Sequence, residues 1–123
     1  MLLEQIEQKL KEIDNKVFYG TVNVNAVKAD EWNFIVFNRG DFSLNQSKSS
    51  VQESYIVTIV RENYIEEDLA EKVIDALEKI RPGLKFSNTK SPYDYLVKPG
   101  TQEVVIETLS LEFINTGKRC FNE

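Results

Sequence analysis

The feature that most constrains this fold is an amphipathic segment, NYIEEDLAEKVIDALEKIRPG, at residues 63–83. Its apolar residues recur every three or four positions, which places them on one stripe of a helix. They are Ile65, Leu69, Val73, Ala76, Leu77 and Ile80. The acidic triplet 66–68 lies in the expected first turn and Lys79 and Arg81 in the last, where the helix dipole favours those charges. Pro82-Gly83 is a stop signal. A helix with one apolar stripe needs an apolar surface to cover, and strands supply it.

A second helix of the same kind is predicted at residues 2–14, with an apolar stripe of Leu3, Ile6, Leu10 and Ile13. Segments rich in β-branched and aromatic residues predict strands. They are residues 16–24, 33–38, 53–60 and 103–115. Gly20 predicts a bulge in the first of them. In the last, Leu109, Leu111 and Phe113 alternate with polar residues, so one face of that strand is expected to be buried.

These elements predict an α+β fold in a single domain, residues 1–123. Hairpin connections favour a mainly antiparallel sheet, and two one-sided helices favour packing on one face of it, as a two-layer sandwich with a long hairpin arm. Turn residues break the stretch 84–102 into short strand pieces. The tail 116–123 is expected to be loose.

The polar arm, residues 39–52, separates two predicted strands and is longer than an ordinary connection. Its charged residues are Arg39, Asp41 and Lys48. Loops of this length are usually functional or disordered. Two interpretations stay open: a contact arm for a neighbouring subunit, and a mobile loop.

The polar arm begins with the tripeptide Arg39-Gly40-Asp41, the letters of a cell-adhesion motif. A strand followed by Asn38 and this tripeptide is also typical of the start of a hairpin turn. Gly40 is free there to take a positive φ, and Asp41 can bond nearby backbone. Nothing in the sequence predicts export, so we interpret the tripeptide as a turn.

Composition argues against most kinds of chemistry. The net charge of −5 gives no basic patch for a phosphate backbone. The chain has no histidine, and Cys120 is its one cysteine. A disulfide within the chain, a zinc site and histidine-dependent nucleophiles are therefore not expected. We predict a protein that is not an enzyme and holds no metal or cofactor. No apolar run approaches the roughly 20 residues of a membrane helix, so a cytoplasmic location is expected.

Two groups of side chains suggest sites, and each has a simpler interpretation. The acidic residues 66–68 could bind a metal, but successive helical positions point about 100° apart, so charge complementation of a helix start is favoured. Tyr93 and Tyr95, with Phe86 and Trp32, could stack nucleic-acid bases. Because the chain is acidic, packing in the core and loops is favoured for these aromatic residues.

Three stretches of the chain resemble a known family. They are LLEQIEQKLKEI (2–13), FIVFNRGDFSLNQSKSSVQESYIVTIVRENYIEEDLAEKVIDALEKI (34–80) and QEVVIETLSLEFI (102–114). Their order resembles the tail terminator, or tail completion, proteins of long-tailed bacteriophages and of prophages in Gram-positive bacteria. The resemblance rests on pattern. Tyr55, Val57 and Ile59 match the family's strand, and Glu67 to Leu77 match its helix.

This resemblance implies a structural virion protein that forms a ring, typically a hexamer. The ring caps the tail tube and meets the head completion or connector protein, while DNA passes through without being specifically bound. Assembly would take place in the host cytoplasm. Another head–tail joining protein, or a small-molecule-binding α+β module, remains an alternative. The residues expected at subunit or partner contacts are Arg39, Asp41, Phe42, Leu44, Lys48, Tyr93 and Tyr95.

Overall fold

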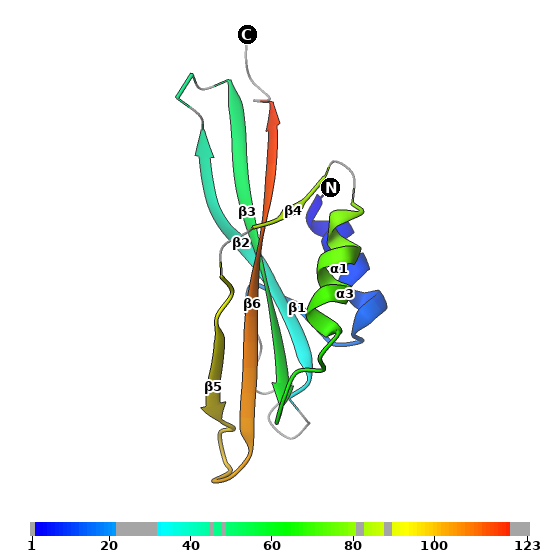
Figure 1. Ribbon diagram of the computed structural model, residues 1–123, viewed down its shortest axis with the longest axis vertical. Coiled ribbons are helices and arrows are strands. Elements are labelled where there is room, and N and C mark those ends of the chain that lie inside the picture. The colour runs from blue at the N-terminus through cyan, green and yellow to red at the C-terminus, as the bar shows by residue number, and fades with distance from the viewer. Residues whose placement is uncertain are drawn as a thin grey trace.

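The computed structural model of the protein describes residues 2–21, 32–44, 46–47, 49–80, 83–87 and 90–118. Within these residues the chain forms two α-helices and one six-stranded sheet. In chain order the elements are α1 (Leu2–Ile13), β1 (Val17–Tyr19), β2 (Phe34–Leu44), β3 (Ser50–Glu62), α3 (Leu69–Glu78), β4 (Lys85–Phe86), β5 (Tyr93–Val97) and β6 (Val105–Lys118). The two helices pack together on one face of the sheet (Figure 1), which confirms the predicted α+β class.

The sheet is mostly antiparallel, and long β3 and β6 form its centre. Its strand order is β1-β2-β3-β6-β4, and β5 also pairs with β6. Every pairing is antiparallel except that of β1 with β2, which is parallel. Both β4 and β5 lie on the outer side of β6, at different heights, with β4 beside Phe113–Ile114 and β5 beside Val105–Leu109. Thus β5 is an edge strand.

The main core lies between the helices and the sheet. Alternate residues of the three long strands point to the helix side, as their period of two requires. This group includes Ile35, Val57, Ile59, Leu111 and Phe113, all at most 2% exposed, and it packs with Ile6, Leu10, Val73 and Leu77 of the helices. The opposite face of the sheet carries a smaller cluster of Phe34, Val60 and Ile106, against which Trp32 packs. The predicted alternation of Leu109, Leu111 and Phe113 is confirmed.

The polar arm is extended strand over most of its length, so its interpretation as a long loop is wrong. β2 continues to Leu44 and β3 begins at Ser50. The polar residues keep strand geometry because β6 runs beside them, pairing Ser50–Glu53 with Asn115–Lys118. Backbone bonding between strands does not require apolar side chains. For the same reason residues 116–118 belong to β6 and are not a loose tail. Lys48 and residues 119–123 lie outside the described residues.

The tripeptide Arg39-Gly40-Asp41 lies within β2 and not in a hairpin turn, which corrects the turn interpretation. The register of β2 against β3 shifts between Arg39 and Phe42, so the chain bulges there. Gly40 has no positive φ, unlike Gly20 and Gly100. Glycine is required for space, because an added Cβ would collide with the Oγ of Ser54. That hydroxyl accepts a hydrogen bond from the Asp41 backbone N–H at 2.6 Å.

Two further local predictions need correction. Gly20 is not a bulge: it follows the end of β1 with a φ of 81°. The helix α3 begins only at Leu69, so Glu66 and Glu67 precede it and are not in its first turn. A turn closed by the Leu69 N–H and the Glu66 carbonyl at 3.1 Å leads into the helix, and the Ile65 N–H before it donates to Glu107 on β6 at 2.6 Å. Lys79 is the C-cap residue; Arg81, residues 22–31, Pro82 and Asn88 lie outside the described residues.

Candidate interaction surfaces

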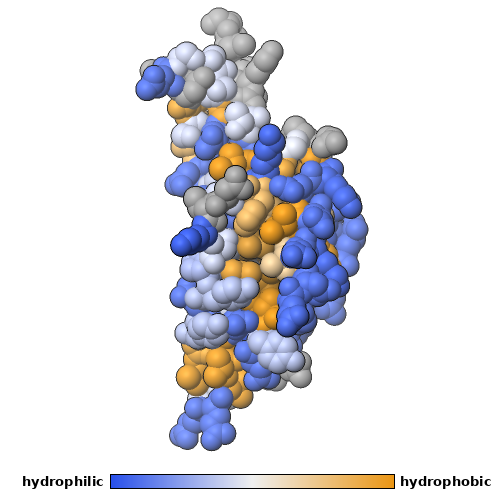
Figure 2. Space-filling view, viewed as in Figure 1, coloured by the Kyte–Doolittle hydropathy of each residue, from blue (hydrophilic) through white to orange (hydrophobic). Residues whose placement is uncertain are grey.

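Strand β5 is exposed along its entire length, although its sequence, YDYLV, is largely apolar and aromatic. Tyr93 is 54% exposed, Tyr95 62% and Val97 53%. The interpretation that the two tyrosines pack in the core and loops is therefore wrong, since neither helix covers β5 (Figure 1). Leu96, on the other face of the strand, and Val105 beside Val97 are 42% and 41% exposed, and apolar side chains appear orange at the lower end of the molecule in Figure 2.

The backbone of β5 has an open side. The Lys98 N–H donates to the Val104 carbonyl at 2.8 Å. In an antiparallel ladder, bonded and non-bonded pairs alternate, so Leu96 and Asp94 also bond toward β6. The N–H and C=O groups of Tyr93, Tyr95 and Val97 consequently point away from β6. Within the described part of the chain no strand pairs with that outer side.

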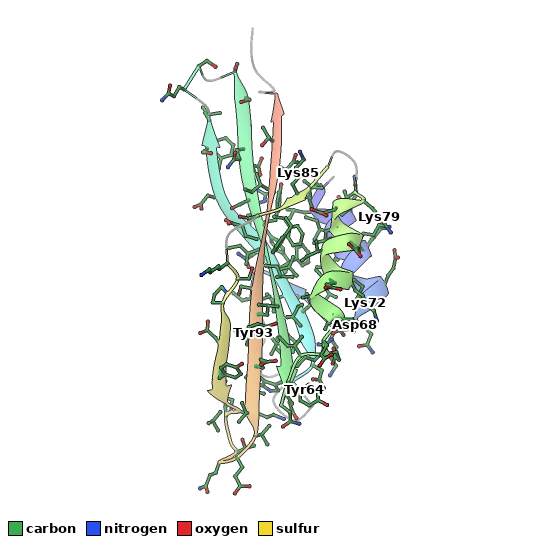
Figure 3. All side chains as sticks on the ribbon, viewed as in Figure 1. Tyr64, Asp68, Lys72, Lys79, Lys85 and Tyr93 are labelled. Carbon is green, nitrogen blue, oxygen red and sulfur yellow. The ribbon has the colours of Figure 1, made fainter. Side chains whose placement is uncertain are left out.

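A shallow pocket of about 410 Å³ adjoins β5 on the helix side of the sheet. Three carboxylates and three tyrosines contribute to it: Glu66, Glu67, Glu107, Tyr64, Tyr93 and Tyr95. Figure 3 shows Tyr64 after the end of β3 and Tyr93 on the upper half of β5. The Tyr95 hydroxyl donates to Glu107 Oε2 at 2.8 Å, and this bond raises the pKa of Tyr95. The pocket therefore combines exposed aromatic rings with negative charge.

The polar arm forms the second exposed surface, beyond the upper end of the helices (Figure 1). Phe42 is 67% exposed and Leu44 37%. Register places Arg39, Phe42 and Leu44 opposite Tyr55, Glu53 and Val51 of β3 respectively, which all lie on the helix side of the sheet. These three arm side chains therefore share the helix side with one another.

A pocket of about 620 Å³ lies where α1 ends and β3 gives way to the segment before α3. Arg61, only 8% exposed, forms an ion pair with Asp14 at 2.9 Å between Nη1 and Oδ2, and a second with Glu66 at 3.2 Å between Nε and Oε1. Glu62 accepts from the Lys98 ammonium at 2.6 Å and from the Trp32 N–H at 3.0 Å.

The bond from Lys98, followed by that from the Trp32 backbone, lowers the pKa of Glu62. Because the charged groups of this pocket bond one another, it acts as a polar joint between helices and sheet. Sequence reasoning missed Arg61 and Glu62. The sequence signal that could have indicated them is a pair of oppositely charged residues directly after the apolar strand that ends at Val60.

The predicted contact residues thus fall into two groups on one sheet. Arg39, Asp41, Phe42 and Leu44 lie on the polar arm, and Tyr93 and Tyr95 lie on β5 at the opposite edge and end. The base-stacking platform, already disfavoured from the sequence, is not formed by these four aromatic residues, because Phe86 packs on Phe113 and Trp32 on Phe34. Among the described residues, no three potential metal ligands of the His, Cys, Asp and Glu types converge.

No protein-family model and no curated protein matches the chain. No helix in the described ranges has the length and apolar character needed to cross a membrane.

Proposed function

We propose that the protein is a structural subunit of a ring, similar to the phage tail terminators, that caps a tail tube and joins it to the head connector. The observation that carries this proposal is the polar arm. It extends the sheet past the helices as paired strands, yet every residue from Arg39 to Leu44 is exposed. A strand that buries nothing in its own domain is well suited to burying a surface on another.

The architecture around the polar arm supports assembly. Long strands β3 and β6 run from the core into the arm without interruption, so the arm is anchored to a rigid two-layer domain. Contacts between unlike surfaces of identical copies generate closed rings when the rotation between copies closes. A domain with one arm and a separate exposed edge has such unlike surfaces.

The negative net charge of the chain is consistent with a ring through which DNA passes without binding. Each chain carries −5, so six copies carry 6 × −5 = −30. DNA would be repelled by such a ring and could pass through it without being specifically bound. Another head–tail joining protein would share these properties, and binding to purified tail tubes as opposed to connectors distinguishes the two. The polar joint around Arg61 does not favour the small-molecule alternative, because its charged groups bond one another.

A shortened arm tests the proposal. Residues 43–52 are replaced by Asn-Gly, a dipeptide suited to a two-residue hairpin, which joins the Phe42–Glu53 pair directly. Because none of the described residues among those removed belongs to the core, thermal unfolding should stay cooperative and close to that of the unaltered protein. Light scattering and negative-stain microscopy should show closed rings for the full arm, and monomers for the shortened one.

Two results would contradict the proposal. One is a full-length protein that stays monomeric at high concentration and does not bind tail tubes. The other is a shortened variant that forms rings as well as the original. If the shortened variant unfolds, the polar arm is a structural part of the domain and is wrongly assigned to assembly.

A further inference from the structure

We infer that β5 of one copy takes up the polar-arm part of β2 from a second copy as an added strand. The inference rests on one part of the proposed function, which is that copies of this chain associate with one another. It assigns the contact to two specific edges: the outer side of β5 and the outer side of Arg39–Leu44.

Both edges are open in the described part of the chain. β1 pairs only with Ile35–Phe37 of β2, so the arm strand beyond it has β3 on one side and no described strand on the other. On β5, alternate backbone groups at Tyr93, Tyr95 and Val97 point outward. Five residues of β5 face six residues of the arm strand, so the lengths match. Open edges of this kind are templates for strand addition.

Strand direction and facing also agree. β2 runs parallel to β6 and β5 antiparallel to it. A second copy displaced without being turned over therefore presents its β2 antiparallel to β5. Its helix side then continues the helix side of the first copy. Arg39, Phe42 and Leu44 of the second copy come to lie on the same face as Tyr93, Tyr95 and Val97, so aromatic and apolar side chains meet across the new pair.

β5 and the arm strand lie at different heights along the strand direction, so each added copy is displaced from the one before it. β5 is centred beside Glu107, and the middle of the arm strand lies level with Asn115, across β3. Eight residues at about 3.3 Å each displace neighbouring copies by roughly 26 Å along the strands. Each copy then still offers one free β5 and one free arm, so association does not stop at a dimer.

Electrostatics favours pairing of β5 with the arm strand of another copy over pairing with the β5 of another copy. The described residues of the arm and of the β6 segment beside it, 39–44, 46–47, 49–54 and 115–118, carry no net charge, whereas the whole chain carries −5. The pocket beside β5 is lined by three carboxylates and no basic residue. Pairing two β5 edges would bring these carboxylates together, whereas the arm brings Arg39, which forms no ion pair among the described residues. Interfaces place complementary potentials in contact.

Cross-linking between single-cysteine variants tests the inference. Phe42→Cys and Tyr95→Cys are each made in a Cys120→Ser background and treated with a flexible bifunctional maleimide, separately and mixed. Covalent dimers are expected in the mixture and in neither variant alone, and their yield should fall as salt is raised, since complementary charges are screened. Val97→Pro, which removes an outward N–H, should weaken association roughly fivefold, the worth of one net hydrogen bond. Val97→Ala is the matched control, and should weaken association less.

Each other outcome is decisive. Dimers of Tyr95→Cys alone would assign β5 to itself, and dimers of Phe42→Cys alone would pair two arms; either overturns the inference. Rings that form without a mixed cross-link overturn the inference and leave the proposed function standing. A mixed cross-link in open chains that never close supports the inference and contradicts the ring. A protein that only ever stays monomeric overturns both.

Discussion

Replacing Gly40 by alanine tests our account of the bulge in β2. The added methyl group would occupy the space of the Ser54 hydroxyl, while the Ser54 Cβ and the Ile56 Cδ1 would each lie 3.4 Å away, at ordinary contact distance. The hydroxyl alone stands in the way. Ser54 is 6% exposed, so its side chain must rotate within the packed sheet and release the Asp41 N–H.

The magnitudes follow from that geometry. Losing the bond to Asp41 costs about 1 kcal/mol, and an unfavourable rotamer costs about 1 kcal/mol more. The smaller entropy of an unfolded chain with alanine returns about 0.5 kcal/mol. Gly40→Ala should therefore destabilise the protein by about 1.5 kcal/mol, and Ser54→Ala by about 1 kcal/mol.

The double variant separates this account from a general intolerance of the strand. With the hydroxyl gone, the new methyl group fits, the bond to Asp41 is lost only once, and alanine still lowers the unfolded-state entropy. The double variant should lose only about 0.5 kcal/mol, a coupling of about −2 kcal/mol. Urea unfolding followed by circular dichroism and by Trp32 fluorescence measures all four proteins. If the double variant instead loses the sum of the two single-variant losses in unfolding free energy, the clash with the Ser54 hydroxyl is not the reason for glycine at position 40.

The polar joint gives two more predictions. The lowered pKa of Glu62 contributes stability above the group's ordinary pKa of 4.5, which is lost as pH falls through the folded-state pKa. Glu62→Gln should therefore flatten the decline of the unfolding free energy between about pH 5 and about pH 3; an unchanged acid slope in urea titrations would contradict this. Asp14→Ala leaves Arg61 buried with only the half-exposed Glu66 and should cost about 2–3 kcal/mol, whereas Glu66→Ala should cost below about 1 kcal/mol. Equal losses in chemical denaturation would show that burial does not set the strength of these pairs.

Much of the fold could be predicted from the sequence because its signals are local. The stripe from Leu69 to Leu77 and the alternation from Leu109 to Phe113 each repeat with the period of one element, so burial follows from spacing alone. Two one-sided helices beside apolar strands then leave few arrangements other than packing on one face of a sheet.

The candidate site was harder to predict, because exposure depends on what lies beside a strand. Tyr93 and Tyr95 have the composition of core residues and are exposed, since β5 pairs at an edge that the helices do not reach. The polar arm has the composition of a loop and is strand, since β6 runs alongside it. Neither neighbour is close in sequence.

The positions of the helices and apolar strands follow from the order of residues alone, because hydrophobic periodicity is a property of consecutive residues. The ends of the strands, the unpaired edges of the sheet and the need for glycine at position 40 depend instead on tertiary contacts. Those properties depend on residues that are distant along the chain, such as Ser54 beside Gly40 and Thr116 beside Gln52. Pairing across a sheet brings such residues together, and no local pattern records it.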